Sequence, residues 1–431
     1  MPSTASEFVA RGASRQEARR RAASRWRPPR VTPMATALYC AGSTTMATRL
    51  LVSCGETSGD LYGGELVRHL RARMGEITVF GLGGDHLAAE GTHLLAHVRE
   101  LGVVGLLEVV RHLRRLHAIY RSVLAEVERD RPALAVLIDY PDFNLRLARA
   151  LRRRGVRVAY YVSPQVWAWR RGRLRVIGET VSHMVVIFPF EEALYRNAGV
   201  PVTFVGHPLV DLVHPPADGA AFLTSLGLAP DRPMVAVLPG SRAQEAAHNL
   251  PPLAGALRLL AVRRPDLQFT LAVAPALDAG SLLPALGELS VVPVKGQAHA
   301  VLGSATLALV ASGTATVEAA LLRTPMVVVY RLSPLTYALG RPFVRVPRFA
   351  MANLIAGREV VKELIQNEFT PEAVSREALT LLDDPARLAR LRDDLRVVGQ
   401  RLGPPGASAR AADVVARLIE EQKLDRTVGY M

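Results

Sequence analysis

Charged and hydroxylated side chains follow several short apolar segments of this sequence, at points where chemistry is commonly done. Asp139 comes directly after the apolar residues 134–138, where a charge is costly unless it meets water, a partner or a substrate. Partial removal from water would raise its pKa, which suits a general base. Asp142 is better explained as the cap of the helix predicted to follow. Asp139 is therefore the candidate base.

Two small-residue segments in the second half of the chain suit the binding of a phosphorylated ligand. Residues 239–242 read Pro-Gly-Ser-Arg, in which the small residues let a ligand approach the backbone and Arg242 can grip two phosphate oxygens. Residues 312–318 read Ser-Gly-Thr-Ala-Thr-Val-Glu, a helix start of the kind that binds anions. Glu318 could accept hydrogen bonds from ribose hydroxyls. Alternatively, its negative charge could simply interact favourably with the dipole of the helix. Together these segments predict a pyrophosphate–ribose site that uses Ser241, Arg242, Ser312, Gly313, Thr314 and Glu318.

Two segments in the first half of the chain have more than one interpretation. Residues 55–60 read Gly-Glu-Thr-Ser-Gly-Asp, which fits either a loop that contacts substrate or phosphate, or an ordinary helix cap with a glycine turn. The GxGxxG dinucleotide fingerprint is absent there. Residues 161–173 place Trp167 and Trp169 beside three arginines, which suits a membrane edge or an anionic, lipid-like substrate. The alternative is one buried tryptophan, one surface tryptophan and a solvated basic face.

Strand and helix patterns alternate along the chain from residue 48 onward, which is typical of parallel sheets covered by helices on both faces. The Pro- and Gly-rich residues 206–232 separate two series of strands. We therefore predict an α/β fold of two Rossmann-like domains, with ligands outside the carboxyl ends of the strands. The expected strands are 49–53, 77–81, 134–139, 157–162, 184–187, 234–238, 268–274, 290–294, 307–311 and 325–330. The expected helices include 60–73, 143–154, 371–384 and 385–402.

Composition excludes some classes of protein. No apolar run reaches the ~20 residues that span a bilayer. The net charge is +14, but only three of the 53 basic residues are lysines, and this preference for arginine is typical of codon bias. The sequence has no compact basic segment interleaved with aromatic residues, which is the pattern that would predict nucleic-acid binding. The cysteines, Cys40 and Cys54, form no disulfide framework, and we interpret His93 and His97 as two polar residues on a helix face. We expect no structural metal and a reducing, cytoplasmic compartment.

Residues 1–46 are rich in Arg, Ala and Ser and lack hydrophobic periodicity, which is typical of a disordered or transit-like extension. The folded pattern begins at Thr48, so Met46 is the simpler start of the chain.

Seven segments of the sequence, in order between about residues 50 and 370, resemble bacterial lipid-A-disaccharide synthases. They are GETSGD (55–60), IDYPDFN (138–144), YVSPQVWAWR (161–170), GHP (206–208), LPGSR (238–242), ASGTATVE (311–318) and NLIAGREVVKELIQ (353–366). The resemblance implies a GT-B glycosyltransferase with two Rossmann-like domains facing a cleft. Its acceptor domain would be 47–205 together with a returning helix near 404–424, and its UDP-sugar domain would be 206–403.

The activity that this resemblance implies is transfer of 2,3-diacylglucosamine from its UDP derivative to 2,3-diacylglucosamine 1-phosphate. The product would be the β-1,6-linked disaccharide of lipid A, with UDP released. By position, Asp139 is implied as the base, and Arg242, Glu318 and Asn353 as UDP-site residues. The implied acceptor-side residues are Glu56, Thr57, Ser58, Asp60, Asn144, Ser163, Trp167 and Arg170. The family further implies no required metal or cofactor, and a peripheral position on the cytoplasmic face of the inner membrane of Gram-negative bacteria.

Two other functions also fit the sequence. One is another GT-B enzyme, such as a UDP-N-acetylglucosamine 2-epimerase or a peptidoglycan glycosyltransferase, although an epimerase would need more acid and base groups around the sugar. The other is a non-catalytic protein that binds nucleotide sugars or lipids, which the strand-end residues of both domains disfavour. Neither acyl-chain length nor oligomeric state follows from these motifs.

Overall fold

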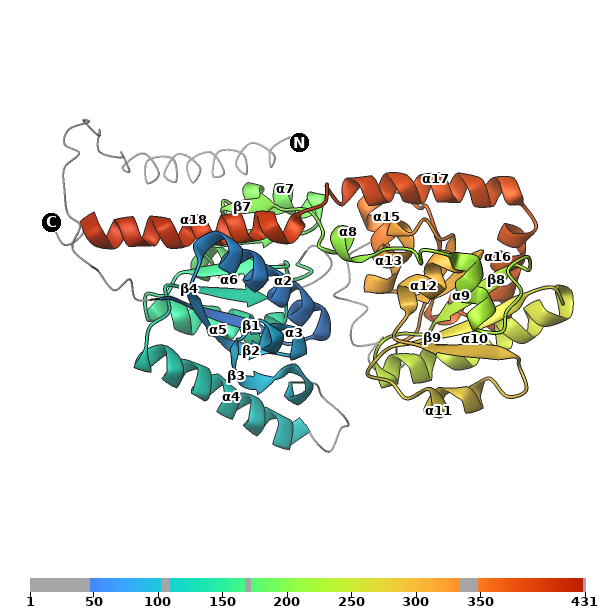
Figure 1. Ribbon diagram of the computed structural model, residues 1–431, viewed down its shortest axis with the longest axis horizontal. Coiled ribbons are helices and arrows are strands. Elements are labelled where there is room, and N and C mark those ends of the chain that lie inside the picture. Colours follow the sequence, from blue (N-terminus) through green and yellow to red (C-terminus); the bar gives the residue numbers. More distant parts are fainter. Residues whose placement is uncertain (1–46, 102–108, 167–171, 333–347, 429–431) are drawn as a thin grey trace, which may run out of the picture. The chain divides into compact units, whose positions relative to one another are not determined.

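The computed structural model describes residues 47–101, 109–166, 172–332 and 348–428. Two parallel sheets form the centre of this part of the chain (Figure 1). The first sheet contains β1 (Thr48–Cys54), β2 (Ile77–Gly83), β3 (His93–His97), β4 (Leu134–Ile138), β5 (Val158–Tyr161), β6 (His183–Val186) and β7 (Val202–Phe204). The second contains β8 (Met234–Leu238), β9 (Gln268–Val273), β10 (Val291–Lys295), β11 (Leu307–Ala311), β12 (Met326–Tyr330) and β13 (Lys362–Ile365).

Strand order brings the candidate residues to one point in each sheet. The orders are β3-β2-β1-β4-β5-β6-β7 and β10-β9-β8-β11-β12-β13. The direction of the connections therefore reverses between β1 and β4, and between β8 and β11. Ligands bind at such switch points, outside the carboxyl ends of the strands. Glu56 and Asp139 follow β1 and β4, and Arg242 and Ser312 follow β8 and β11.

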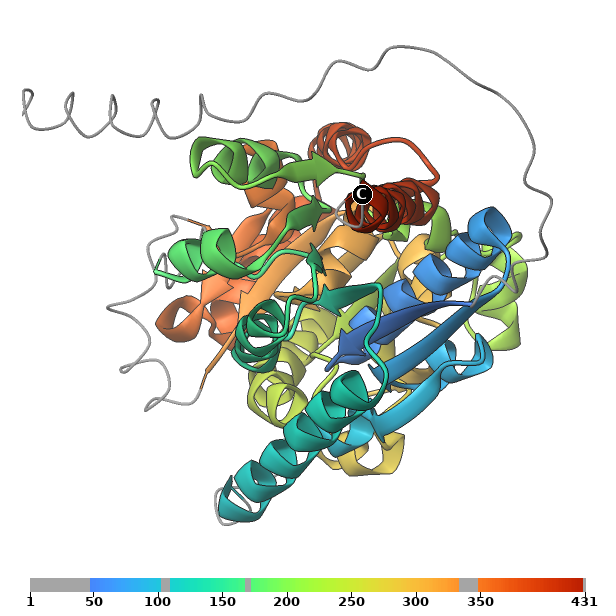
Figure 2. The ribbon, with the colours of Figure 1, turned by 90° about the vertical axis from the view of Figure 1, so that its left-hand side faces the viewer.

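Helices cover both faces of the first sheet because its central strands are apolar on both sides. Leu50 of β1 packs in one core with Leu66 of α2 (Thr57–Met74), whereas the next residue, Leu51, packs in the other with Val123 of α4 (Val109–Arg129). Figure 2 shows these two helices, coloured blue and teal, on opposite sides of that sheet. The other helices near it are α3 (Asp85–Ala89), α5 (Pro141–Arg153), α6 (Arg173–Thr180) and α7 (Pro189–Asn197).

The second sheet has its own covering helices. They are α10 (Ala243–Arg263), α12 (Ala298–Ser304), α13 (Thr314–Leu321), α15 (Met351–Ala356), α16 (Pro371–Leu382) and α17 (Pro385–Arg401), with the shorter α8 (Leu209–Leu212), α9 (Gly219–Ser225) and α11 (Ala279–Leu282) beside them. The last helix, α18 (Ala407–Val428), packs along α2 and so lies against the first sheet (Figure 1). This is the helix that the resemblance implied near residues 404–424.

Two chain segments connect the parts that carry the two sheets, and hydrogen bonds join them. The His207 N–H donates to the Leu402 carbonyl at 2.8 Å. The Asp211 carboxylate accepts from the N–H groups of Gly406 and Ala407 at 2.8 to 3.2 Å, which caps the start of α18. The two connecting segments are therefore held together by hydrogen bonds as well as by packing.

All ten strands expected from the sequence are present, and three more were not expected. The unexpected strands are β3, β7 and β13, which are edge strands of their sheets and carry weaker apolar patterns. His93 and His97 lie on β3, so their interpretation as polar residues of a helix face was wrong. Asp142 was also interpreted wrongly, since it lies within the first turn of α5 and forms an ion pair with Arg173 instead of capping the helix.

Candidate active site

Asp139 lies in a tight turn between β4 and α5. Asp139 and Tyr140 both have left-handed backbone conformations, with φ of +44° and +48°. The side-chain amide of Asn144 holds this turn by donating to the carbonyls of Asp139 at 2.8 Å and Ile138 at 3.2 Å. Its amide oxygen accepts from the Ser53 hydroxyl at 2.8 Å. The turn therefore holds Asp139 just past the carboxyl end of β4, and Asn144, which supports the turn, is fully buried.

The electrostatic surroundings of Asp139 suit a proton acceptor. Burial, and next the negative charge of Glu56, raise the pKa of Asp139 to about 7. A hydrogen bond from the Tyr140 N–H and the positive charges of Arg242 and Arg173 act in the opposite direction. A carboxylate with a pKa near neutrality is far more basic than an ordinary aspartate. At pH 7 this group is ionised in about half of the protein molecules.

Arg242 reaches the first sheet from the second. Its guanidinium donates to Glu56 at 2.8 Å and contacts Glu245, on the first turn of α10, at 3.4 Å. Gly240 has a φ of +129°, and a Cβ there would approach the Glu245 side chain to 2.7 Å, so the turn requires a glycine. More than half of the Arg242 side chain is exposed, at 62 %. The guanidinium is therefore accessible to a ligand that could replace Glu56.

The start of helix α13 offers a second positive region beside the second sheet. Gly313 and Thr314 are exposed, and the N–H groups of a first helical turn have no acceptors within the helix. The Ser312 hydroxyl donates to the Phe349 carbonyl at 3.0 Å, so it braces a neighbouring loop. Glu318, one turn into α13, lies 3.9 Å from Nε2 of His299 on α12. Burial raises the pKa of Tyr62 on α2, a helix that covers the first sheet, and the negative charge of Glu318 also contributes to this rise.

Four residues expected to contact substrate or UDP are buried and hold the backbone instead. Asn144 supports the Asp139 turn, as described above. The Asp60 carboxylate accepts from the N–H groups of Gly84, His86 and Leu87 at 2.6 to 3.1 Å and so caps α3. The Ser163 hydroxyl bonds to the Tyr195 hydroxyl at 2.7 Å. In this structure these three side chains support the loops at the strand ends, and their contact with a ligand stays a prediction.

Asn353 is the fourth such residue and is fully buried. Its amide oxygen accepts from the N–H groups of Val360 and Val361 at 2.7 and 2.9 Å. Its amide nitrogen donates to the Val361 carbonyl at 2.8 Å and to Glu363 at 2.7 Å. Asn353 therefore fixes the loop between α15 and β13, and its contact with UDP stays a prediction.

The remaining predicted residues are accessible or lie outside the described part of the chain. Glu56 is the residue before α2, and its side chain is 43 % exposed. Thr57 and Ser241 are exposed, and Ser58 is half-buried. Trp167 and Arg170 lie outside the described residues, so their positions in the site stay predictions.

The structure also adds residues that the motifs did not single out. Tyr330 lies at the end of β12 and is hydrogen-bonded to Glu245, with a pKa raised by burial. The Tyr160 hydroxyl donates to the Asp139 carbonyl at 2.6 Å, and His299 faces Glu318. Tyr330 could have been found by the argument used for Asp139, because it too is a polar residue that ends an apolar strand. His299 carries no comparable signal in the sequence.

Comparison with known sequences identifies the family of this chain. The family model described as lipid-A-disaccharide synthetase matches residues 50–410. A curated relative from Myxococcus xanthus, named lipid-A-disaccharide synthase, is 44% identical over 377 residues, which cover 87% of this chain and 98% of the relative. The chain belongs to the lipid-A-disaccharide synthase family. It is a glycosyltransferase of lipid A disaccharide formation.

Solved structures confirm the fold expected for this family. A UDP-N-acetylglucosamine 2-epimerase from Neisseria meningitidis, bound to UDP-GlcNAc, is similar with a TM-score of 0.60, at 11% identity over 86% of this chain and all of its own. The calicheamicin glycosyltransferase CalG4 is similar with a TM-score of 0.56, at 17% identity over 88% of this chain and 99% of its own. At such low identity these likenesses show the two-sheet GT-B fold alone. The epimerase alternative therefore rests on fold only, whereas the synthase assignment rests on sequence over most of the chain.

Proposed function

We propose that this enzyme transfers 2,3-diacylglucosamine from its UDP derivative to the 6-hydroxyl of 2,3-diacylglucosamine 1-phosphate. The acceptor oxygen forms the new bond to the anomeric carbon while the bond from that carbon to the UDP oxygen breaks. The hydroxyl proton passes to Asp139, and UDP leaves with the electron pair of the broken bond. Attack from the face opposite UDP inverts the anomeric carbon and gives the β-1,6 linkage.

The proposal depends chiefly on Asp139, because its pKa of about 7 makes it a carboxylate that can take a proton as the hydroxyl attacks. It lies at the switch point of the first sheet, and the charges of both Glu56 and Arg242 act on it. The charge of a cation that follows a strand of the second sheet therefore acts on the base.

The leaving diphosphate needs positive charge, which we assign to Arg242 and the start of α13. In this arrangement the diphosphate replaces Glu56 as the partner of Arg242, and a charged pair with two hydrogen bonds is a strong contact for phosphate. Preorganised donors of this kind stabilise charge that develops as a bond breaks. We propose that these groups suffice without a metal ion, so that activity would persist in excess EDTA.

We also propose that the enzyme acts at the cytoplasmic face of the inner membrane as a peripheral protein, because both proposed substrates carry acyl chains. Among the described residues, no helix is long and apolar enough to cross a bilayer. Attachment would then depend on surface contacts and on the substrates themselves.

Product analysis tests the proposed reaction. Purified enzyme is mixed with the diacylated UDP-sugar and the diacylated monosaccharide phosphate, and the products are identified by mass and by the anomeric coupling constant. We expect a β-linked disaccharide phosphate together with one equivalent of UDP. Conversion of the donor to a sugar epimer, or binding of the donor with no UDP released in the presence of acceptor, would refute the proposal.

A further inference from the structure

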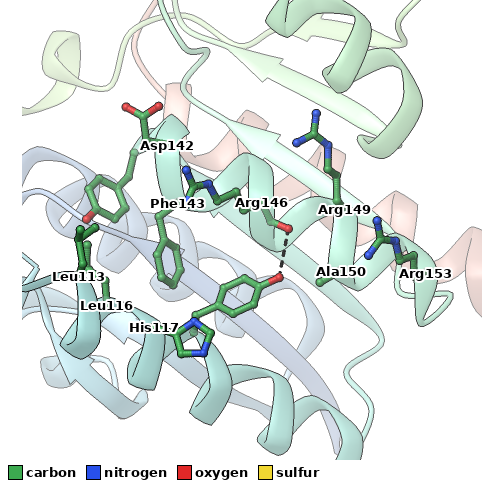
Figure 3. A pocket seen from close by; sticks show the side chains of 11 residues that line it. Leu113, Leu116, His117, Asp142, Phe143, Arg146, Arg149, Ala150 and Arg153 are labelled. Carbon is green, nitrogen blue, oxygen red and sulfur yellow. Dashed lines mark hydrogen bonds between the residues drawn. The ribbon is translucent and has the colours of Figure 1, made fainter. Parts of the chain in front are cut away.

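A cavity of about 560 Å³ lies between helices α4 and α5, and the reaction described above leaves it unassigned (Figure 3). Its apolar wall includes Leu113 and Leu116 of α4 and Phe143 of α5. Two tyrosines complete this wall, since Tyr120 packs edge-to-face against Phe143 at 5.9 Å and Tyr140 stacks on it at 5.7 Å. Leu113 is 57% exposed, so its side chain is open to a ligand beside this wall.

Three arginines follow the other side of the same cavity. Arg146, Arg149 and Arg153 are three and seven positions apart on α5, so they share one face of that helix. Figure 3 shows them on α5, with Leu113, Leu116 and His117 on α4. All three are exposed, and no carboxylate among the described residues forms an ion pair with them. The carboxylate that does line the cavity, Asp142, is paired with Arg173 instead.

The cavity lies next to the turn that carries the candidate base. Tyr140 and Asp142 line it, and they are one and three residues from Asp139. Arg146 is five residues beyond the first residue of α5, a helical rise of about 7.5 Å. A sugar phosphate whose hydroxyl lies at Asp139 would therefore extend along α5 toward the arginines.

We propose that this cavity binds the acceptor, with its phosphate on Arg146, Arg149 and Arg153 and an acyl chain on the apolar wall from α4. The assignment rests on the proposed function, which supplies an acceptor with an acyl chain and a phosphate. The phosphate of either the acceptor or a bilayer phospholipid would complement the arginines, but the position of the cavity beside the Asp139 turn favours the acceptor. Arginine suits the phosphate, because its planar guanidinium donates two parallel hydrogen bonds to phosphate oxygens.

Steady-state kinetics with charge-neutralising variants test the proposal. The variant R146Q/R149Q/R153Q is compared with R152Q/R263Q/R376Q, which removes three exposed arginines that do not line the cavity. Both are assayed in neutral detergent micelles with the acceptor and the donor varied separately. We expect the first variant to raise KM for the acceptor about tenfold or more, with little change in KM for the donor, and the control to stay within about twofold of wild type.

An acceptor without phosphate makes the test specific. With 2,3-diacylglucosamine as the probe, wild type and R146Q/R149Q/R153Q are expected to have the same KM, because the contact that the substitutions remove is already absent. The apolar wall is tested separately by L113D, which changes an exposed side chain and should raise KM for the diacyl acceptor.

The outcomes separate the proposal from its alternatives. An equal rise in KM for the control variant would overturn it, since net charge alone would then explain the effect. Weaker binding of R146Q/R149Q/R153Q to phosphatidylglycerol vesicles with an unchanged KM for the acceptor would also overturn it and assign the cavity to a bilayer lipid. If wild-type enzyme released no UDP with any acceptor, the proposed function itself would fail, whatever the arginines bind.

Discussion

At the scale of single residues, the site depends on one carboxylate that is made basic by its position. Asp139 is half-buried at a strand end, and the charge of Glu56 adds to the effect of burial on its pKa. Arg242 pairs with Glu56 and so limits that effect. The basicity of Asp139 is therefore tied to the residue that we assign to the leaving diphosphate.

Replacing Glu56 by glutamine should lower the pKa of Asp139, because a negative charge that raises it is removed. A base must be deprotonated to act, so activity falls as the pH drops below its pKa. We expect the acidic limb of the kcat/KM profile of E56Q to move to lower pH, which gives it a larger share of its maximal activity at pH 6 than wild type. E179Q, on the exposed side of α6, is the control and should keep the wild-type profile. A limb that stayed in place or moved to higher pH would contradict the electrostatic account of this site.

At the scale of elements, loops at the strand ends are held by buried polar side chains. Asn144, Asp60 and Asn353 each bind several backbone groups, and each satisfies donors or acceptors that would otherwise be buried without a partner. Through these hydrogen bonds they position the neighbouring loops.

Asn353→Ala should destabilise the protein by about 2–3 kcal/mol, because the N–H groups of Val360 and Val361 lose their buried acceptor. The loop that these residues belong to should loosen, and KM for the UDP-sugar should rise more than KM for the acceptor. Chemical denaturation and kinetics on the same preparation measure both effects. Asn197→Ala, at an exposed helix end, is the matched control and should change stability by less than about 0.5 kcal/mol. Wild-type stability in N353A would show that the loop is held by something else.

The sequence predicted the strand ends well but not the partners of the residues found there. Apolar runs that end in a polar residue identify Asp139 and the segments around Arg242 and Ser312, because parallel strands align their carboxyl ends. Whether such a residue faces a ligand or the protein depends on contacts between distant segments. Asn144 bonds to Ser53, 91 positions away, and Asp60 bonds to residues 24 to 27 positions away. No local pattern records these contacts, which explains why buried loop supports were predicted as ligand contacts.

At the scale of the molecule, two parallel sheets are connected by two segments that bind to each other. His207 is fully enclosed between Tyr62 and Phe188, and burial lowers its pKa to about 3, so it stays neutral at physiological pH. The backbone N–H of His207 donates to the Leu402 carbonyl on the second segment, and Asp211 caps α18. The last helix thereby anchors the end of the chain on the first sheet.

Asp211→Ala should reduce stability by about 1–2 kcal/mol, because the start of α18 loses its cap. It should also lower kcat/KM, since α18 packs along α2, whose first residues follow Glu56. Asp218→Ala removes a comparable cap from the exposed helix α9 and should leave transfer unchanged. Thermal unfolding and transfer assays on both variants check this expectation. Equal effects on transfer in the two variants would show that the α18 contact has no particular role in activity.

The most direct test of the whole account is the turnover of Asp139→Asn, measured together with its affinity for UDP. Asparagine is well tolerated at a positive φ, so the turn should be preserved while the base is lost. We expect kcat to fall by about 10²–10⁴-fold, as for loss of a general base, while the dissociation constant of UDP measured by calorimetry changes by less than about twofold. Near-normal turnover in D139N, with UDP bound as in wild type, would contradict it.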